Sequence, residues 1–156
     1  MSAQSARVAV IMERRALDNR WQSESWQPVA VVADPGDAAP ELIFDDGART
    51  RWSHPGFVID LYRDEAEGYF LNMTTGQPFV FVMTRMEEGR SVPKIVTVSY
   101  NEAGRMMDGG EQVDGVPMPR EVAEMVDAYV AANYRPETKK RIRPPSFKGA
   151  RRDSSG

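Results

Sequence analysis

"YFLNMTTGQPFVFVMTRMEEGRSVPKIVTVS", residues Tyr69–Ser99, is the stretch that decides the predicted fold. It holds three short apolar runs, Tyr69–Met73, Phe79–Thr84 and Lys94–Ser99, separated by the turn-forming segments TTGQP and MEEGRSVP. Apolar runs of this length, separated by Gly- and Pro-containing turns at hairpin spacing, are typical of antiparallel strands. The stretch therefore predicts a meander in which no helix lies between the strands.

Further strands are predicted on the N-terminal side, and helices on the C-terminal side. The four additional apolar runs are Arg7–Met12, Pro28–Val32, Glu41–Phe44 and Phe57–Arg63. Beyond them, Ser99 and Glu102 have the spacing of a capping box, which predicts a short helix through Asp108 that ends at Gly109. A longer helix is predicted from Pro119 to about Tyr134. Its apolar stripe would consist of Val122, Met125, Val126, Tyr129 and Val130.

Together these elements predict the α+β class, as an antiparallel curled sheet or partial barrel of six to seven strands. A short helix and a longer C-terminal helix would accompany the sheet. We predict one globular domain over residues 1–134, followed by a basic, disordered tail over residues 135–156.

Composition narrows the possible chemistry. The chain of 156 residues contains no cysteine and a single histidine. Cysteine nucleophiles, thiolate metal sites and disulfides are therefore excluded. The glycine-rich phosphate-binding motifs and the Gly-x-Ser-x-Gly nucleophile motif do not occur either. We predict no metal site, no cofactor, no catalytic residues and no membrane association, and we expect the protein in the cytoplasm.

Charge is distributed unevenly along the chain. Residues 1–134 hold 12 Lys and Arg against 21 Asp and Glu, a net charge of −9, whereas residues 135–156 hold 8 against 2, a net charge of +6. The basic cluster Lys139, Lys140, Arg141 and Arg143 is a candidate partner-binding site. Nucleic-acid binding and a merely solvated tail are the alternatives, and the acidic body makes nucleic acid the less favoured of the two.

Two tryptophans stand close together in "DNRWQSESW", residues 18–26. Trp21 and Trp26 are five residues apart, which fits neither one strand face nor one helix face. We interpret the segment first as a structural corner in which a large aromatic side chain plugs the end of the sheet. The alternative is a partner-binding face formed by Arg20, Trp21 and Trp26, because Trp and Arg are enriched at interface hot spots.

His54 lies in "RWSHPG". We interpret it as a loop histidine, since its Pro-Gly neighbours are turn formers. The alternative is a small-ligand or enzymatic site near Trp21, Trp52 and His54. The clustered carboxylates, such as Glu87 and Glu88, are interpreted as solvated turns.

Several of these segments also resemble a known family. They are Arg20-Trp21 with Trp26-x-Pro28, the run Glu67-Gly68-Tyr69, Asn72, and Val116-Pro117-Met118-Pro119. They resemble the bacterial domain-of-unknown-function family numbered 3305, and the similarity extends from about Val8 to Arg143. The resemblance implies no activity and no catalytic residues. Members of this family are typically encoded beside molybdenum-dependent formate dehydrogenases.

The resemblance therefore implies a non-catalytic accessory protein or small subunit of a molybdopterin-dependent oxidoreductase, which acts through contacts with a subunit of that enzyme. The small-ligand site and nucleic-acid binding through the basic tail remain the alternatives.

Overall fold

The computed structural model describes residues 5–34, 36 and 39–135. Strands dominate the described part of the chain. They are β1 (Ser5–Ala16), β2 (Glu24–Ala33), β3 (Glu41–Asp45), β4 (Arg49–Asp60), β5 (Phe79–Glu87), β6 (Arg90–Thr97) and β7 (Gln112–Pro117). The helices are a 3-10 turn (Arg63–Glu65), α1 (Ala66–Met73), α2 (Tyr100–Asp108) and α3 (Arg120–Asn133).

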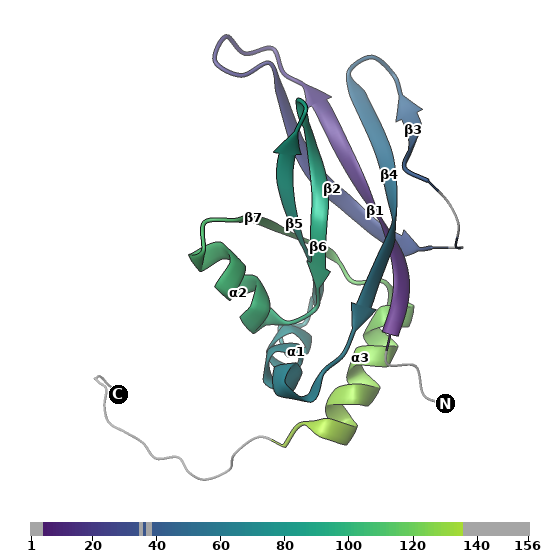
Figure 1. Ribbon diagram of the computed structural model, residues 1–156, viewed down its shortest axis with the longest axis vertical. Coiled ribbons are helices and arrows are strands. Elements are labelled where there is room, and N and C mark those ends of the chain that lie inside the picture. The colour runs from purple at the N-terminus through teal and green to yellow at the C-terminus, as the bar shows by residue number, and fades with distance from the viewer. Residues whose placement is uncertain (1–4, 35, 37–38, 136–156) are drawn as a thin grey trace, which may run out of the picture.

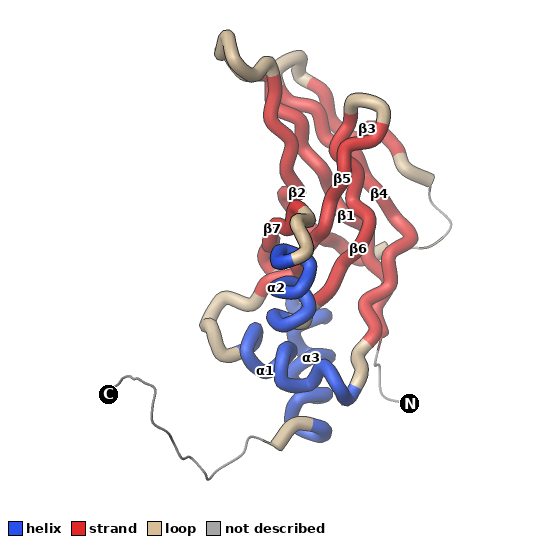
Figure 2. The backbone as a smooth tube through the Cα atoms, turned by 60° about the vertical axis from the view of Figure 1, so that its left-hand side comes forward, coloured by secondary structure: helices blue, strands red, loops and turns tan. Residues whose placement is uncertain are grey.

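The strands form two antiparallel sheets. The first has the order β2-β1-β4-β3 and the second the order β6-β5-β7. Helices gather at one end of the molecule, which we call the helix end, and the hairpins β1–β2, β3–β4 and β5–β6 extend away from it to the strand end (Figures 1 and 2). The predicted α+β class is confirmed, with seven strands divided between two sheets.

A single apolar core joins both sheets to the helices. β1 is central in its sheet and is buried from Val8 to Glu13. Val8, Val10 and Met12 pack in one cluster with residues of the second sheet and of α1 and α3. The predicted stripe of α3 takes part, since Val122, Met125, Val126 and Tyr129 are all buried. The core therefore binds the two sheets together toward the helix end.

The predicted helices α2 and α3 are confirmed to within a residue, and so is the cap of α2. Ser99 Oγ accepts a hydrogen bond from the Glu102 amide at 3.0 Å. In a capping box Glu102 would also accept directly from the Ser99 amide. Here Thr97 lies between them: its Oγ1 accepts from the Ser99 amide at 3.1 Å and donates to Glu102 at 2.6 Å.

The predicted strand Tyr69–Met73 is wrong, because these residues belong to helix α1. Its buried residues Ala66, Tyr69 and Asn72 recur every three residues, which is a helical spacing. The acidic Glu67 in the first turn also favours a helix N-terminus. The meander is therefore interrupted by a helix.

Strand boundaries also differ from the prediction. β4 begins at Arg49 rather than near Phe57, so His54 lies in a strand and not in a loop. A bulge opposite Val8–Val10 accommodates Pro55 and Gly56, and Gly56 has a φ of 93° there. The predicted link after Gly110 contains strand β7, and the predicted loop before Lys94 is reduced to the two-residue turn between β5 and β6.

Candidate functional site

The two sheets separate at the strand end and leave an open groove between them. Its first hollow, about 480 Å³, is lined by Trp26, Trp52, His54, Glu88, Arg90 and Ser91 among others. Its second hollow, about 410 Å³, includes Gln22, Glu24, Thr84, Met86 and Gln112. Trp26 and Ser91 line both hollows. We call this feature the tryptophan groove.

Trp26 is fixed by a chain of polar contacts along the first sheet. Its indole Nε1 donates to Glu24 Oε2 at 2.8 Å. Glu24 Oε1 accepts from Arg14 at 3.3 Å, and the same guanidinium donates to Thr50 Oγ1 at 3.1 Å. Arg14 and Trp26 are directly opposite each other in the β1–β2 register. The indole is therefore held in place without a ligand, which lowers the entropic cost of binding one.

Trp52 lies on β4 of the same sheet as Trp26 and is contacted by Arg90 from β6 of the second sheet. The Arg90 guanidinium carbon lies 4.3 Å from the centroid of the Trp52 ring, within the range of a cation–π contact. His54, two residues along β4, lines the same hollow and has a lowered pKa. Burial is the larger cause, and the positive charge of Arg90 adds to it. Because that pKa lies below its ordinary value of 6.5, His54 is neutral at pH 7.

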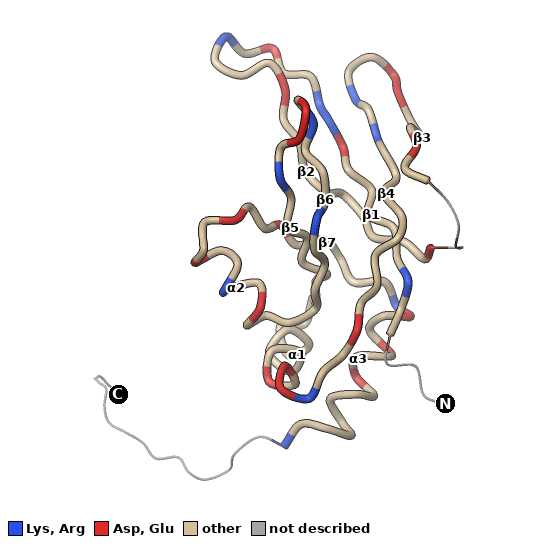
Figure 3. Tube along the Cα trace, in the orientation of Figure 1, with Lys and Arg blue, Asp and Glu red and all other residues tan. Residues whose placement is uncertain are grey.

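Most charges on the groove are neutralised by partners within the fold. Glu24 pairs with Arg14, Glu87 pairs with Lys94 at 2.7 Å, and Arg85 pairs with Glu111. Figure 3 shows both signs of charge side by side near the β5–β6 turn. Arg90 differs, because it has no carboxylate within 4.0 Å among the residues that the structure describes. Among the described residues that line the first hollow, the Arg90 guanidinium and the Glu88 carboxylate are therefore the charges without an ion-pair partner.

The turn that presents Arg90 is conformationally demanding. Glu88 and Gly89 both have positive φ values, 54° and 82°, as the tight two-residue turn of a twisted hairpin requires. Glycine adopts this conformation readily, whereas a glutamate there is unusual. Glu88 also lines the first hollow. The strained residue is thus located at the rim of the groove.

Arg20 and Trp21 lie at the tip of the β1–β2 hairpin. Trp21 is 83% exposed, so the interpretation of this side chain as a plug of the sheet is wrong. The Arg20 guanidinium carbon lies 5.4 Å from the Trp21 ring centroid, and the Trp21 amide donates to Asn19 Oδ1 at 2.7 Å. Trp26 lies on β2 and is partly buried. The structure therefore places the two tryptophans in different settings at the same end of the molecule.

The alternative of a small-ligand site near Trp21, Trp52 and His54 is matched only in part, because Trp52 and His54 line the same hollow and Trp21 is not among its lining residues. Trp26 takes its place. Sequence reasoning missed Arg90 and Ser91 because it treated residues 86–93 as a loop. The Glu-Gly dipeptide between two apolar runs was the available hairpin signal.

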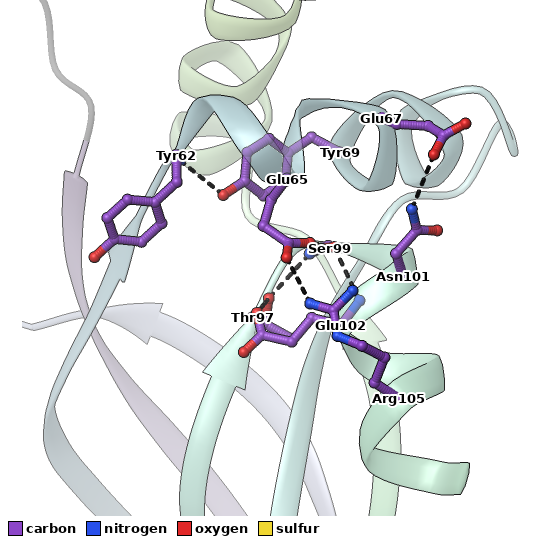
Figure 4. A network of polar contacts seen from close by, with 9 residues as sticks. All are labelled: Tyr62, Glu65, Glu67, Tyr69, Thr97, Ser99, Asn101, Glu102 and Arg105. Atoms are coloured by element: carbon purple, nitrogen blue, oxygen red, sulfur yellow. Dashed lines mark hydrogen bonds and ion pairs between the residues drawn. The ribbon is translucent and has the colours of Figure 1, made fainter.

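A polar network at the helix end connects α1, α2 and β6 (Figure 4). Glu65 accepts hydrogen bonds from Ser99 Oγ at 2.6 Å and from Arg105. Tyr69 accepts from the Tyr62 amide at 2.9 Å, and burial of the Tyr69 hydroxyl raises its pKa to about 12. This network lies within the fold and joins its elements.

Two residues beside this network belong to the motif of the family resemblance. Asn72 is 1% exposed and links β5 to the segment after β6: its side chain donates to the carbonyls of Phe79 and Val98 and accepts from the Phe79 amide. Gly68 packs so closely on α2 that a Cβ would lie 2.1 Å from Ser99 Oγ. These motif residues therefore have structural roles.

Other predicted features have more limited outcomes. Lys139, Lys140, Arg141 and Arg143 lie outside the described residues, so tail-mediated nucleic-acid binding stays a prediction. Within residues 5–34, 36 and 39–135, no group of three or more potential metal ligands occurs. No helix in that part of the chain is long and apolar enough to span a membrane.

The fold and groove define an α+β protein with two antiparallel sheets that separate at one end. A model of the family described as "Protein of unknown function (DUF3305)" matches residues 7–143. The chain belongs to this family. No curated protein and no solved structure matches the chain.

Proposed function

We propose that the chain is a non-catalytic accessory protein that binds a protein partner through its strand end and acts in the cytoplasm. The observation that carries this proposal is the indole of Trp21, which is 83% exposed at a hairpin tip with Arg20 stacked on it. Burial of a large aromatic side chain is favourable in free energy, so leaving one in water forgoes that stabilisation. Trp and Arg are also enriched in interface hot spots. Partner contact explains this exposure.

The proposed partner is a subunit of a molybdopterin-dependent oxidoreductase of the formate dehydrogenase type. The gene neighbourhood that the family resemblance implies supports this choice. The partner surface would include Arg20, Trp21 and the adjacent groove with Trp26. The basic residues Lys139, Lys140, Arg141 and Arg143 are proposed as a second contact.

Crosslinking followed by affinity purification from the native cell tests both parts of the proposal. The full chain should recover a molybdenum enzyme subunit, and Trp21→Ala should lower that recovery at least about tenfold, as loss of a hot-spot residue does. Tyr62→Ala is the matched control, since Tyr62 is a 58% exposed aromatic residue close to the helix end. Failure to recover any molybdenum enzyme subunit would refute the proposed partner, and equal recovery by Trp21→Ala would refute the proposed surface.

A second candidate function is small-ligand binding in the tryptophan groove, because Trp52 and His54 line one hollow of ligand-like volume. A small molecule that raises the Tm of the native chain, but not that of Trp52→Leu, would support this candidate over partner binding.

A further inference from the structure

The tryptophan groove is longer than either of its hollows. The two hollows, about 480 Å³ and 410 Å³, meet at Trp26 and Ser91 and open between the β5–β6 hairpin and the first sheet. A compact group would fill only one of them. A groove of this form suits an extended peptide segment, whose side chains can enter both hollows.

The walls of the groove exist before any ligand binds. Trp26 is tied to Glu24, and Trp52 is covered by Arg90 at 4.3 Å. This contact places the Arg90 guanidinium over the Trp52 ring, beside the first hollow. A guanidinium in this setting can pair with a carboxylate through two parallel hydrogen bonds.

The charges favour an acidic guest over a basic one. Glu24 and Glu87 already have basic partners, so of the three lining glutamates only Glu88 has no ion pair with a described residue. A basic guest would meet Arg90 already seated on Trp52. Residues 1–134 are acidic overall, but at physiological ionic strength charges are screened over about 8 Å, so the groups that line the groove matter most. Of these, Arg90 is the one whose charge acts on His54 inside the first hollow.

The hydrogen-bond donors in the first hollow also favour an acidic ligand. Among the described residues, the side chains of Trp52, His54 and Ser91 make no hydrogen bond, and all three line the first hollow with Arg90. The positive charge of Arg90 also lowers the pKa of His54, which places the guanidinium's field inside this hollow. A carboxylate there would meet the guanidinium and neutral donors.

We propose that the tryptophan groove binds an extended acidic segment of the protein partner, in which a carboxylate pairs with Arg90 and the neighbouring side chains pack against Trp26 and Trp52. This inference rests on the proposed function, because it states the chemistry of the segment that the partner presents.

Peptide binding to the full, nitrogen-15-labelled chain tests the inference. The probes are the pentapeptide acetyl-Ala-Glu-Phe-Glu-Ala-amide and its versions with Gln or Lys in place of both Glu residues. The chain has three tryptophans, so its indole N–H signals report each one separately. We expect the signals of Trp26 and Trp52 to shift and that of Trp21 to stay. The Glu peptide should bind at least about tenfold more tightly than the Gln peptide.

Arg90→Gln should abolish the preference for the Glu peptide over the Gln peptide. Because Arg90 is exposed, this substitution should leave the fold intact. Arg120→Gln is the matched control, because it removes the same charge from an exposed position at the start of α3 and should keep the preference. Equal binding of the Glu and Gln peptides, tighter binding of the Lys peptide, or a shift of the Trp21 signal alone would overturn the inference.

The same variants separate this inference from the proposed function. If Arg90→Gln recovers the molybdenum enzyme subunit as well as the native chain does while Trp21→Ala does not, the proposed function holds and the inference fails. If the Glu peptide is preferred through Arg90 but no molybdenum enzyme subunit is recovered, the acidic-segment site holds and the proposed partner fails.

Discussion

The helix end and the strand end of this molecule use similar polar residues in opposite ways. At the helix end, Glu65 accepts from Ser99 and Arg105, and Asn72 makes three hydrogen bonds to the backbone of β5 and the segment after β6. At the strand end, Arg90 is stacked on Trp52 and has no carboxylate partner among the described residues. One end is closed and the other is open.

The difference shows where the fold is specified and where binding can occur. A buried polar group whose partner lies within the fold stabilises that fold, and its loss leaves the partner unsatisfied. A polar group that faces an open groove exchanges water for a ligand, so its loss affects binding. Substitutions at the helix end should therefore lower the free energy of unfolding, whereas those in the groove should mainly change affinity.

Asn72→Ala should have the largest effect on stability. The substitution leaves the Phe79 amide and two carbonyls without their side-chain partner at a site that is 1% exposed. Because each buried unsatisfied group is costly, we expect the free energy of unfolding to fall by roughly 3 kcal/mol. Urea denaturation followed by circular dichroism measures this change.

The control for Asn72 is Asn101→Ala. Asn101 makes only an exposed contact with Glu67 at 3.2 Å, so its replacement should change the free energy of unfolding by about 0.5 kcal/mol or less. Equal losses for the two variants would show that the helix end is not held by its buried polar contacts.

Gly68→Ala should have the second largest effect. Its new Cβ would lie 2.1 Å from Ser99 Oγ, so the cap of α2 and the bond from Ser99 to Glu65 would have to shift. We expect a loss of about 2 kcal/mol, the size of an overpacked contact.

Gly104→Ala is the matched substitution in α2, where nothing lies within 4 Å of the new Cβ. It should stabilise the protein by about 0.5 to 1 kcal/mol, since alanine favours a helix interior over glycine. Thermal denaturation should therefore move the Tm of the two glycine variants in opposite directions, and shifts in the same direction would contradict the close-packing argument.

The sequence predicted the parts of the fold that depend on local signals. Ser99, Gly109 and the apolar stripe of α3 act within one or two helical turns, and both of these helices form as expected. Tyr69–Met73 was misassigned because its apolar residues suit a strand as well as a helix. The three-residue spacing of Ala66, Tyr69 and Asn72 was the available local signal for α1, whereas the contact of Asn72 with Val98, 26 residues further along the chain, is part of no local pattern.

The candidate site was predictable only in part, for the same reason. Trp26, Trp52 and His54 belong to the scarcest residue types in the sequence, but Arg90 becomes significant only through its position over Trp52, 38 residues earlier in the chain. Arg90 and Trp52 are brought together by the packing of the second sheet against the first. The exposure of Trp21 likewise could not be inferred, because a hairpin tip and a buried corner contain similar residues.

Trp52→Leu should show the reverse of the behaviour of Asn72. It removes a partly buried indole and one cation–π contact, so the free energy of unfolding should fall by only about 1 kcal/mol. Affinity for the acidic pentapeptide should nevertheless fall at least about tenfold. A loss of stability as large as that of Asn72→Ala, with peptide binding unchanged, would mean that the groove is a structural part of the fold.

The titration of His54 is the smallest and most local test of the open end. Its pKa is lowered by burial and by Arg90, while Glu87 and Glu88 also line the hollow. The unfolded chain therefore binds a proton more readily near pH 6.5, so the contribution of neutral His54 to stability is complete above that pH and is lost as the pH falls through the folded pKa.

His54 is the only histidine in the chain, so its proton NMR signal can be followed without ambiguity. Arg90→Gln should raise this pKa toward 6.5, and the acidic pentapeptide should raise it in the native chain, because a carboxylate stabilises the imidazolium. If the peptide binds but leaves the His54 titration unchanged, its carboxylate does not lie in the first hollow.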